Sequence, residues 1–342
     1  MEINLVLSHI QQGLVEKRQQ LSQWLSRAPV PQVEQQTGAS GRGGVLEHLQ
    51  VIDQALEKSE AKTLGICQVC NDYVNPSLLE MDYTACVCLD HLSEKERRQL
   101  EQELELSQAV QRAMLPQEMP AIPGVELAAF SRPAQIVGGD YFDFFKFQDG
   151  AHGLAIADVM GHGMSASLLV TSLQTALRSL VPEDRSPSEV IQRMNHFYLH
   201  NVNYPTFVTL TLGRYDPAAH TLTYCNAGHN PPAHWRSQER RMEWLRPTGP
   251  AIGIVEDSRY SLATANLSAG DALLFYTDGV TEATNLHDEL FGSHRLAELV
   301  EQNAHLPAQE LVYAVRQALA SFCGARPQAD DITLLALKAE YQ

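Results

Sequence analysis

Four aspartates in the C-terminal part of the chain are the residues best suited to chemistry. Each lies at the end of a short apolar run typical of a β-strand: Asp140 in Val-Gly-Gly-Asp, Asp158 in Ala-Asp-Val-Met-Gly, Asp278 in Tyr-Thr-Asp-Gly and Asp330 in Ala-Asp-Asp-Ile-Thr. Carboxylates are preferred ligands of Mg²⁺ and Mn²⁺. If these strand ends converge, the four side chains would hold a pair of ions that activate water between them, which predicts a hydrolase.

A simpler interpretation must be weighed against this one. A lone Asp-Gly after a strand is in most cases only a turn. Four such sites within one stretch of chain make that explanation much weaker for the whole set, although spacing alone does not separate a phosphatase from another carboxylate-metal hydrolase.

A second group of residues has the spacing of a zinc site. Two residues lie between Cys67 and Cys70, and also between Cys88 and His91, and seventeen residues separate the two pairs. Each pair can hold one side of a tetrahedral ion, and thiolate and imidazole suit Zn²⁺. We therefore expect one structural Zn²⁺, with Cys86 as an alternative to Cys88; reduced cysteines without a metal are the simpler reading.

Composition limits the class of protein. The 342 residues include 41 acidic and 25 basic side chains, a net charge of −16, which argues against general attraction to nucleic acid or anionic membranes. Hydrophobic residues make up 44% of the chain, enough for a packed core, and the length suits two domains. No apolar run reaches the ~18 residues of a membrane span, and the N-terminus lacks a basic flank, so we expect a cytoplasmic protein.

The N-terminal third is predicted to be helical around the cysteine cluster. Apolar residues recur at helical spacing from Leu7 to Trp24 and from Val45 to Leu56, which predicts a helical hairpin with its tip between Ala28 and Gly44. Ser93 and Glu96 have the form of a capping box that opens a connecting helix, and Pro116 would stop it.

The remaining chain alternates short apolar runs with helical stretches. The expected strands are 125–130, 153–157, 207–215, 221–226, 271–276 and 332–338, and the expected helices are 166–180, 186–198 and 307–322. Strand pairs that are close in sequence favour hairpins over crossovers. We therefore predict an α+β fold in which antiparallel sheets are covered by helices.

Five motifs in this part of the chain resemble the SpoIIE/RsbU-type branch of the PPM metal-dependent serine/threonine phosphatases. They occur in the family's order from about Leu115 to the C-terminus, as Val137-Gly-Gly-Asp-Tyr-Phe-Asp143, Ala157-Asp-Val-Met-Gly-His-Gly163, Asn226-Ala-Gly-His-Asn-Pro-Pro232, Tyr276-Thr-Asp-Gly-Val-Thr-Glu-Ala283 and Asp330-Asp-Ile-Thr333. The resemblance implies an αββα sandwich with two Mn²⁺ or Mg²⁺ ions between its sheets.

The resemblance also implies roles for individual residues. Asp140 and Asp158 would bridge the two ions, Val159 would lend its backbone carbonyl, and Asp278, Asp330 and secondarily Asp331 would complete the metal shell. Eukaryotic relatives have a histidine, proposed as general acid, where this chain has Met160. His162 is out of register with that position and is expected to be a loop residue, with a proton donor or phosphate contact as the alternative. His229 and Asn230 lie on a predicted turn, where a structural and a catalytic role both stay open.

The segment 45–92 resembles the DksA/TraR zinc-finger family in Ile52-Asp-Gln-Ala-Leu-Glu57, in Gly65-Ile-Cys-Gln-Val-Cys70 and in the seventeen-residue gap. His91 replaces the usual fourth cysteine. Long-coil members act on RNA polymerase through acidic residues at the tip, whereas the hairpin tip here has no aspartate and only Glu34. We therefore expect a regulatory zinc module over 1–92, a connecting helix over 93–118 and a phosphatase domain over 119–342.

The favoured function is a Mn²⁺/Mg²⁺-dependent phosphoserine/phosphothreonine phosphatase, in which a water held by the ion pair attacks the phosphate. The resemblance suggests an anti-sigma-factor antagonist of the STAS type as substrate, and the connecting helix suggests a homodimer. The alternatives are a DksA/TraR-like transcription regulator with the phosphatase domain as a scaffold, and a hydrolase of small phosphate esters.

Overall fold

The computed structural model describes residues 2–27, 41–81, 83–147, 149–161, 163–183, 186–202 and 206–340. It divides into two compact units, Met1–Glu103 and Leu104–Gln342. The division falls inside helix α5 (Glu94–Met114), so the connecting helix is shared by both units. No helix among the described residues is long and apolar enough to cross a membrane.

The first unit contains two long helices, α1 (Glu2–Arg27) and α3 (Gly41–Glu60), followed by the short α4 (Pro76–Met81) and a 3₁₀ turn, η2 (Leu89–His91). Leu14 of α1 packs with Ile52 and Ala55 of α3 in a small buried cluster. Most of the predicted hairpin tip lies outside the described residues. Its last part, Gly41–Gly44, belongs to helix α3, so the prediction that the tip extends to Gly44 was wrong.

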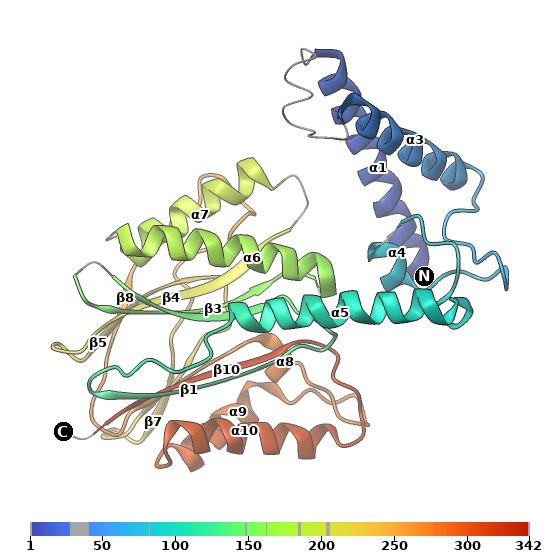
Figure 1. The fold of residues 1–342 in the computed structure, drawn as a ribbon. Helices are drawn as coiled ribbons and strands as arrows, with labels where there is room; N and C mark the ends of the chain where they lie inside the picture. Colours follow the sequence, from blue (N-terminus) through green and yellow to red (C-terminus); the bar gives the residue numbers. More distant parts are fainter. Residues whose placement is uncertain are drawn as a thin grey trace. The chain divides into compact units, whose positions relative to one another are not determined.

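The second unit contains two five-stranded antiparallel sheets (Figure 1). The first has the order β1-β10-β9-β6-β7, formed by β1 (Val125–Arg132), β6 (Ala233–Arg236), β7 (Arg241–Trp244), β9 (Ala272–Tyr276) and β10 (Ile332–Ala339). The second has the order β2-β3-β4-β5-β8, formed by β2 (Asp140–Lys146), β3 (His152–Val159), β4 (Val208–Asp216), β5 (Thr221–Ala227) and β8 (Ala263–Asn266).

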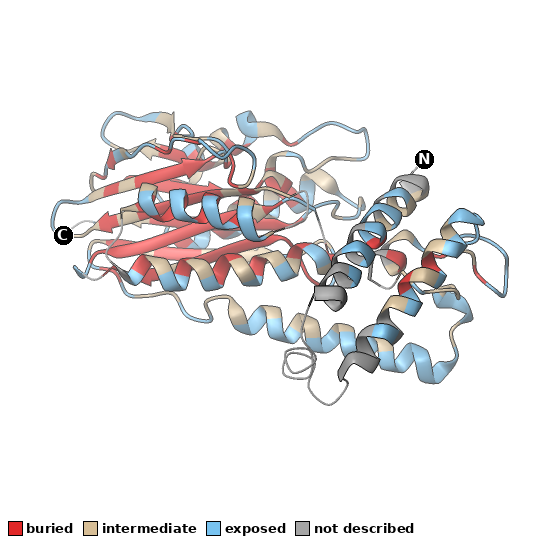
Figure 2. Ribbon diagram, turned by 90° about the horizontal axis from the view of Figure 1, so that it is seen from above, coloured by how far each residue is buried: buried red, intermediate tan, exposed pale blue. Residues whose placement is uncertain are grey.

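Helices cover the outer face of each sheet, which completes an αββα sandwich (Figure 1). The second sheet packs against α6 (Gly163–Leu180) and α7 (Pro187–Asn201), and the first against α9 (Gly292–Asn303) and α10 (Ala308–Cys323). A third apolar cluster fills the space between the sheets and includes Phe142, Ile156, Phe275 and Leu335. The strands are accordingly the most buried part of this unit (Figure 2), and the predicted fold class is confirmed.

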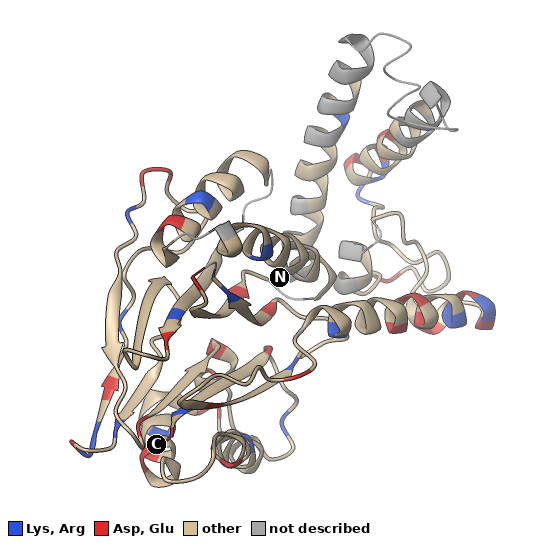
Figure 3. Ribbon diagram, turned by 60° about the vertical axis from the view of Figure 1, so that its left-hand side comes forward, with Lys and Arg blue, Asp and Glu red and all other residues tan. Residues whose placement is uncertain are grey.

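Local sequence signals explain several helix boundaries. Ser186 and Glu189 form a reciprocal capping box at the start of α7. At α5 the Ser93 amide donates to the Glu96 carboxylate at 2.9 Å, while the Glu96 amide donates to Ser93 Oγ at 3.3 Å. Charged residues crowd the first half of α5 (Figure 3), and the helix ends at Met114, shortly before Pro116.

An ion pair with a buried carboxylate fixes helix α6 to the second sheet. Arg178 of α6 donates two hydrogen bonds, each 2.9 Å long, to the carboxylate of Asp143 in β2. The Tyr141 hydroxyl donates to the same carboxylate at 2.5 Å. Because Asp143 is almost fully buried, this bidentate pairing compensates its charge and holds the strand that begins at Asp140.

Candidate functional site

The four aspartates come from both sheets of the sandwich. Asp140 is the first residue of β2, and its antiparallel partner in β3 is Asp158. Asp278 is the first residue of the short helix α8 (Asp278–Thr281), directly after β9, and Asp330 lies two residues before β10. Since β9 and β10 are neighbours in the first sheet, each sheet contributes two carboxylates to one end of the sandwich. Asp140 begins β2 and Asp330 precedes β10, whereas the sequence motifs suggested that both follow strands.

The carboxylates of this site repel one another. Burial, and then repulsion by Asp158 and Asp331, raises the pKa of Asp140 well above its usual range. Burial, and then the charges of Asp278 and Asp330, raises the pKa of Asp158 to about 7. The pKa of Asp278 rises to about 6 for the same two reasons, with Asp330 as its strongest neighbour. A cluster of carboxylates that raise one another's pKa values is an unfavourable arrangement that bound cations would relieve.

The carboxylate of Asp331 holds the loop that precedes Asp140, residues 133–139. Its oxygens accept the backbone N–H groups of Ala134 at 2.7 Å and Gly139 at 2.6 Å. Asp331 is also buried. Both of its oxygens are therefore engaged by the loop, a contact that the sequence did not indicate for this secondary metal candidate.

Two glycines at the site are required by the close approach of Asp331. A Cβ atom added to Gly138 would lie 2.3 Å from Oδ2 of Asp331, and one added to Gly279 would lie 2.0 Å from the carbonyl oxygen of Asp331. No side chain fits at either position. The glycines thus allow the loop, helix α8 and the start of β10 to meet at the carboxylate cluster.

Two polar residues that sequence reasoning missed also position the site. Gln111 of α5 donates to the Gly138 carbonyl at 2.7 Å and accepts the Gly138 N–H at 3.1 Å, so its amide pairs with one peptide group of the loop. The Thr277 hydroxyl donates to Asp140 at 2.7 Å and accepts the backbone N–H of Thr333 at 3.0 Å. Thr277 therefore links the first sheet to a carboxylate of the second.

The remaining motif residues have distinct surroundings. Val159 is buried in β3, and its N–H donates to the Gly139 carbonyl at 3.1 Å. Met160 is partly exposed at the end of that strand, and His162 lies outside the described residues. His229 is buried, its Nδ1 lies 2.8 Å from Thr209 Oγ1, and burial lowers the pKa of its imidazole to about 3. A neutral His229 fits a positioning role beside β4.

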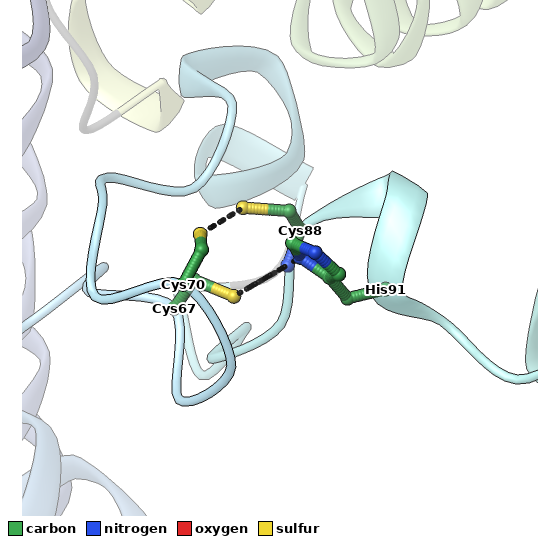
Figure 4. Close-up of side chains that lie close together, drawn as sticks. All are labelled: Cys67, Cys70, Cys88 and His91. Carbon is green, nitrogen blue, oxygen red and sulfur yellow. Dashed lines mark hydrogen bonds between the residues drawn. The ribbon is translucent and has the colours of Figure 1, made fainter.

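In the first unit, the four predicted zinc ligands lie together (Figure 4). Their ligand atoms are all within 4.8 Å of one another, with Cys70 Sγ 3.7 Å from Cys88 Sγ and Cys67 Sγ 3.7 Å from His91 Nδ1. A tetrahedron with Zn–S bonds of ~2.3 Å has edges of about 3.8 Å. The donor set and its spacing therefore fit Zn²⁺, and Cys86 is not part of the group.

Hydrogen bonds to sulfur favour the thiolate form of Cys67, whereas desolvation and the sulfurs of Cys67 and Cys70 raise the pKa of Cys88 to about 12. Against the effect of desolvation, backbone N–H groups near Cys67 lower the pKa of its thiol to about 5. The N–H groups of Val69 and Cys88 lie 3.4 and 3.3 Å from its Sγ. A metal ligand must be deprotonated, so this environment suits a coordinating cysteine.

The sandwich and its carboxylate site define the class of this protein. The family model for stage II sporulation protein E (SpoIIE) matches residues 148–340, more than half of the chain. The chain therefore belongs to the SpoIIE family. The SiaA-PP2C domain of Pseudomonas aeruginosa has the same fold, with a TM-score of 0.64 at 24% sequence identity over 71% of this chain and 98% of that chain.

Individual relatives are similar over the same region. Phosphoserine phosphatase RsbU of Bacillus subtilis is 29% identical over 242 residues, which are 71% of this chain and 71% of RsbU. Phosphoserine phosphatase RsbP of the same organism is 27% identical over 67% of this chain and 56% of its own length. The crystal structure of the RsbU and RsbW domains of Rv1364c from Mycobacterium tuberculosis matches with a TM-score of 0.57 at 29% identity, over 65% of this chain and 62% of that one.

Proposed function

We propose that this protein is a metal-dependent phosphatase that hydrolyses phosphoserine or phosphothreonine on a regulatory protein. The observation that carries the proposal is the meeting of Asp140 and Asp158 from one sheet with Asp278 and Asp330 from the other. Burial, and then repulsion between neighbouring carboxylates, raises the pKa values of the first three. The similarity to two phosphoserine phosphatases supports the same activity.

The donor set fits hard divalent cations, because four carboxylates and a backbone carbonyl are all oxygen ligands. Asp140 and Asp158 would bridge two Mn²⁺ or Mg²⁺ ions, Val159 would contribute its carbonyl, and Asp278 and Asp330 would complete the shell. When bound, such ions neutralise phosphoryl oxygens and lower the pKa of water. Asp331 then acts by orienting the loop that carries Asp140, since both of its oxygens accept loop N–H groups.

Among the residues that the structure describes, the site is prepared without a histidine acid; His162 lies outside them. Thr277 fixes the orientation of the Asp140 carboxylate through its 2.7 Å hydrogen bond. His229 is held neutral by burial and contacts Thr209, the β4 partner of Asp158. Met160 cannot donate a proton. We therefore assign protonation of the leaving serine to solvent at the site.

The proposal is tested by release of inorganic phosphate from a phosphoserine peptide in Mn²⁺. Asp158→Asn and Asp278→Asn should each lower turnover by at least about a hundredfold, because they remove a ligand at the reacting centre. Asp257→Asn is a matched control at an exposed aspartate. Activity that survives both substitutions would exclude the proposed centre. Nucleotides hydrolysed in preference to phosphopeptides would identify a small-ester hydrolase instead.

For the substrate, we infer a phosphorylated antagonist of an anti-sigma factor with a STAS fold. Similarity to RsbU and RsbP supports this inference. Incubation with purified phosphorylated STAS proteins should release phosphate. The loss of the phosphoprotein band on a phosphate-affinity gel measures this reaction. Hydrolysis of unrelated phosphoproteins at the same rate would argue against it.

We further propose that the first unit binds one structural Zn²⁺ and regulates the phosphatase, as a DksA/TraR-like module would. The four-residue group Cys67, Cys70, Cys88 and His91 supports the proposal through its spacing. Metal analysis should find one zinc per chain in the wild type and none in Cys70→Ser, whereas Cys86→Ser should keep it. Zinc retained by Cys70→Ser would contradict the ligand set. Co-purification with RNA polymerase without phosphatase activity would favour a transcription regulator.

Finally, we propose that α5 pairs with a second copy of the chain. Leu106 and Val110 stand one helical turn apart on this helix with 66% and 52% of their surface exposed. Light scattering should detect a dimer for the wild type and a monomer for the Leu106→Glu/Val110→Glu variant. A dimer that persists in this variant would remove α5 from the interface.

A further inference from the structure

A groove with three arginines in its lining opens directly beside the aspartate centre. It has a volume of about 490 Å³ and lies between the end of β1, the C-terminal part of α10 and the segment that leads to β10. Gly279, Glu282 and Asp330 line its end at the centre, and Arg132, Arg316 and Arg326 line the rest of it together with apolar and neutral residues. The groove thus extends from the carboxylates to a cluster of guanidinium groups.

The three arginines differ in their partners. Arg326 forms an ion pair with Asp288 at 2.6 Å and is therefore neutralised locally. Arg316 lies over the Phe130 ring, 3.7 Å from its centroid, and the Nε of Arg132 donates to Gln328 at 2.5 Å. Within the described ranges, neither Arg132 nor Arg316 forms an ion pair with a carboxylate. Two positive charges are therefore held in place but left unneutralised.

These two charges stand out against the charge of the whole chain, which is −16. A net negative protein repels acidic partners, so a local basic patch beside the site would favour their approach. Guanidinium groups bind carboxylates through paired hydrogen bonds, and a stacked ring keeps Arg316 oriented before a ligand arrives.

We propose that this groove binds an acidic segment of the substrate protein next to its phosphoserine, with Arg132 and Arg316 contacting the acidic side chains. The proposal rests on the phosphatase function proposed above and adds a substrate class to it. Asp330 belongs both to the centre and to the groove lining. When a phosphoserine is bound at the aspartates, the residues next to it in the substrate would therefore lie in the groove. The groove volume of about 490 Å³ suits a few residues of extended chain rather than a phosphate alone.

The test compares two phosphoserine peptides that differ only in their flanking residues, Asp and Glu in one and Asn and Gln in the other. The wild type should have a higher kcat/KM for the acidic peptide. Arg132→Gln and Arg316→Gln should each lower that value by about five- to tenfold, as expected for the loss of one charge-assisted pair. Hydrolysis of the neutral peptide and of p-nitrophenyl phosphate should change less than about twofold. Arg259→Gln serves as a matched control, because Arg259 is exposed and does not line the groove.

A binding measurement provides a second readout that does not depend on turnover. Fluorescence anisotropy with the Asp278→Asn protein and a labelled acidic phosphopeptide should show affinity that decreases about fivefold or more when Arg132→Gln is added. The affinity should also fall as NaCl rises, and less steeply in the arginine variant. An affinity that the arginine substitutions do not change would overturn the proposal.

The outcomes separate this inference from the function on which it rests. A wild type that hydrolyses neither peptide nor p-nitrophenyl phosphate contradicts the phosphatase itself. Equal kcat/KM for the two peptides contradicts the groove assignment alone. A parallel loss of p-nitrophenyl phosphate hydrolysis in the arginine variants would show that these residues contact the phosphate, which also overturns the docking role.

Discussion

Replacing Asp158 by asparagine should stabilise the metal-free protein while it abolishes activity. Asp158 is placed among Asp278, Asp330 and Asp331, whose charges, together with burial, raise its pKa from 3.8 to about 7. Ionising this carboxylate in the folded state without cations is therefore unfavourable. Asparagine has a similar shape and no charge, so it removes the repulsion.

The magnitude follows from the pKa shift. A rise of about three units corresponds to about 4 kcal/mol at ~1.4 kcal/mol per unit. This is an upper limit because the buried amide keeps a desolvation cost, and we expect a gain of about 2 kcal/mol at pH 8. The folded state binds more protons than the unfolded state between about pH 4 and pH 7, so the stability of the metal-free wild type falls as pH rises through this window. The gain should accordingly shrink toward pH 5.

Urea unfolding in EDTA, followed by circular dichroism at pH 8 and pH 5, measures this difference. Asp257→Asn, at an exposed site, should not change the midpoint. With saturating Mn²⁺ the wild type should be more stable than Asp158→Asn, because the wild type alone retains all proposed ligands. A destabilised Asp158→Asn protein in EDTA at pH 8 would refute the reasoning.

The apparent affinity for Mn²⁺, measured by calorimetry, should fall from pH 8 to pH 6, because protons compete for Asp158 and Asp278, whose pKa values are about 7 and 6; an affinity independent of pH would contradict this. Gly279→Ala should lose activity and lower the free energy of unfolding by at least about 2 kcal/mol, since its Cβ would lie 2.0 Å from the Asp331 carbonyl oxygen. Thermal unfolding measures this loss, and Gly13→Ala, at a position with open space around it, should be tolerated. Gln111→Ala should raise the Mn²⁺ concentration needed for half-maximal phosphate release about tenfold, because it frees the Gly138 peptide group. Gln102→Ala, on the exposed face of α5, should leave this concentration unchanged.

The sequence predicts those elements whose signals are local. Capping residues such as Ser186 and Ser93 place helix starts, and apolar runs place β1, β3, β4, β5, β9 and β10. Strand β2 was missed because Asp140–Lys146 is buried on both faces and shows no alternation, its buried Asp143 being neutralised only by the distant Arg178. The edge strands β7 and β8, only four residues long, carry too weak a pattern to predict.

The candidate site also combines residues that local motifs predict with residues that they do not. The motifs select Asp140, Asp158, Asp278 and Asp330, and in the structure each sheet contributes two of these four. The residues that position the aspartates could not be predicted from the sequence, because their contacts join distant parts of the chain. Asp331 binds a loop nearly two hundred residues earlier in the sequence, and Gln111 reaches that loop from α5. Nothing in the local sequence around either residue indicates these partners.

The central claim is that the four aspartates form one two-metal centre. Anomalous X-ray scattering from crystals of the full chain grown with Mn²⁺ tests it most directly. We expect two manganese peaks, both within coordination distance of Asp140 and Asp158, with Asp278 and Asp330 completing the shell at ~2.1 to 2.3 Å. Manganese bound away from these side chains, or no manganese at the site in an active preparation, would contradict the account.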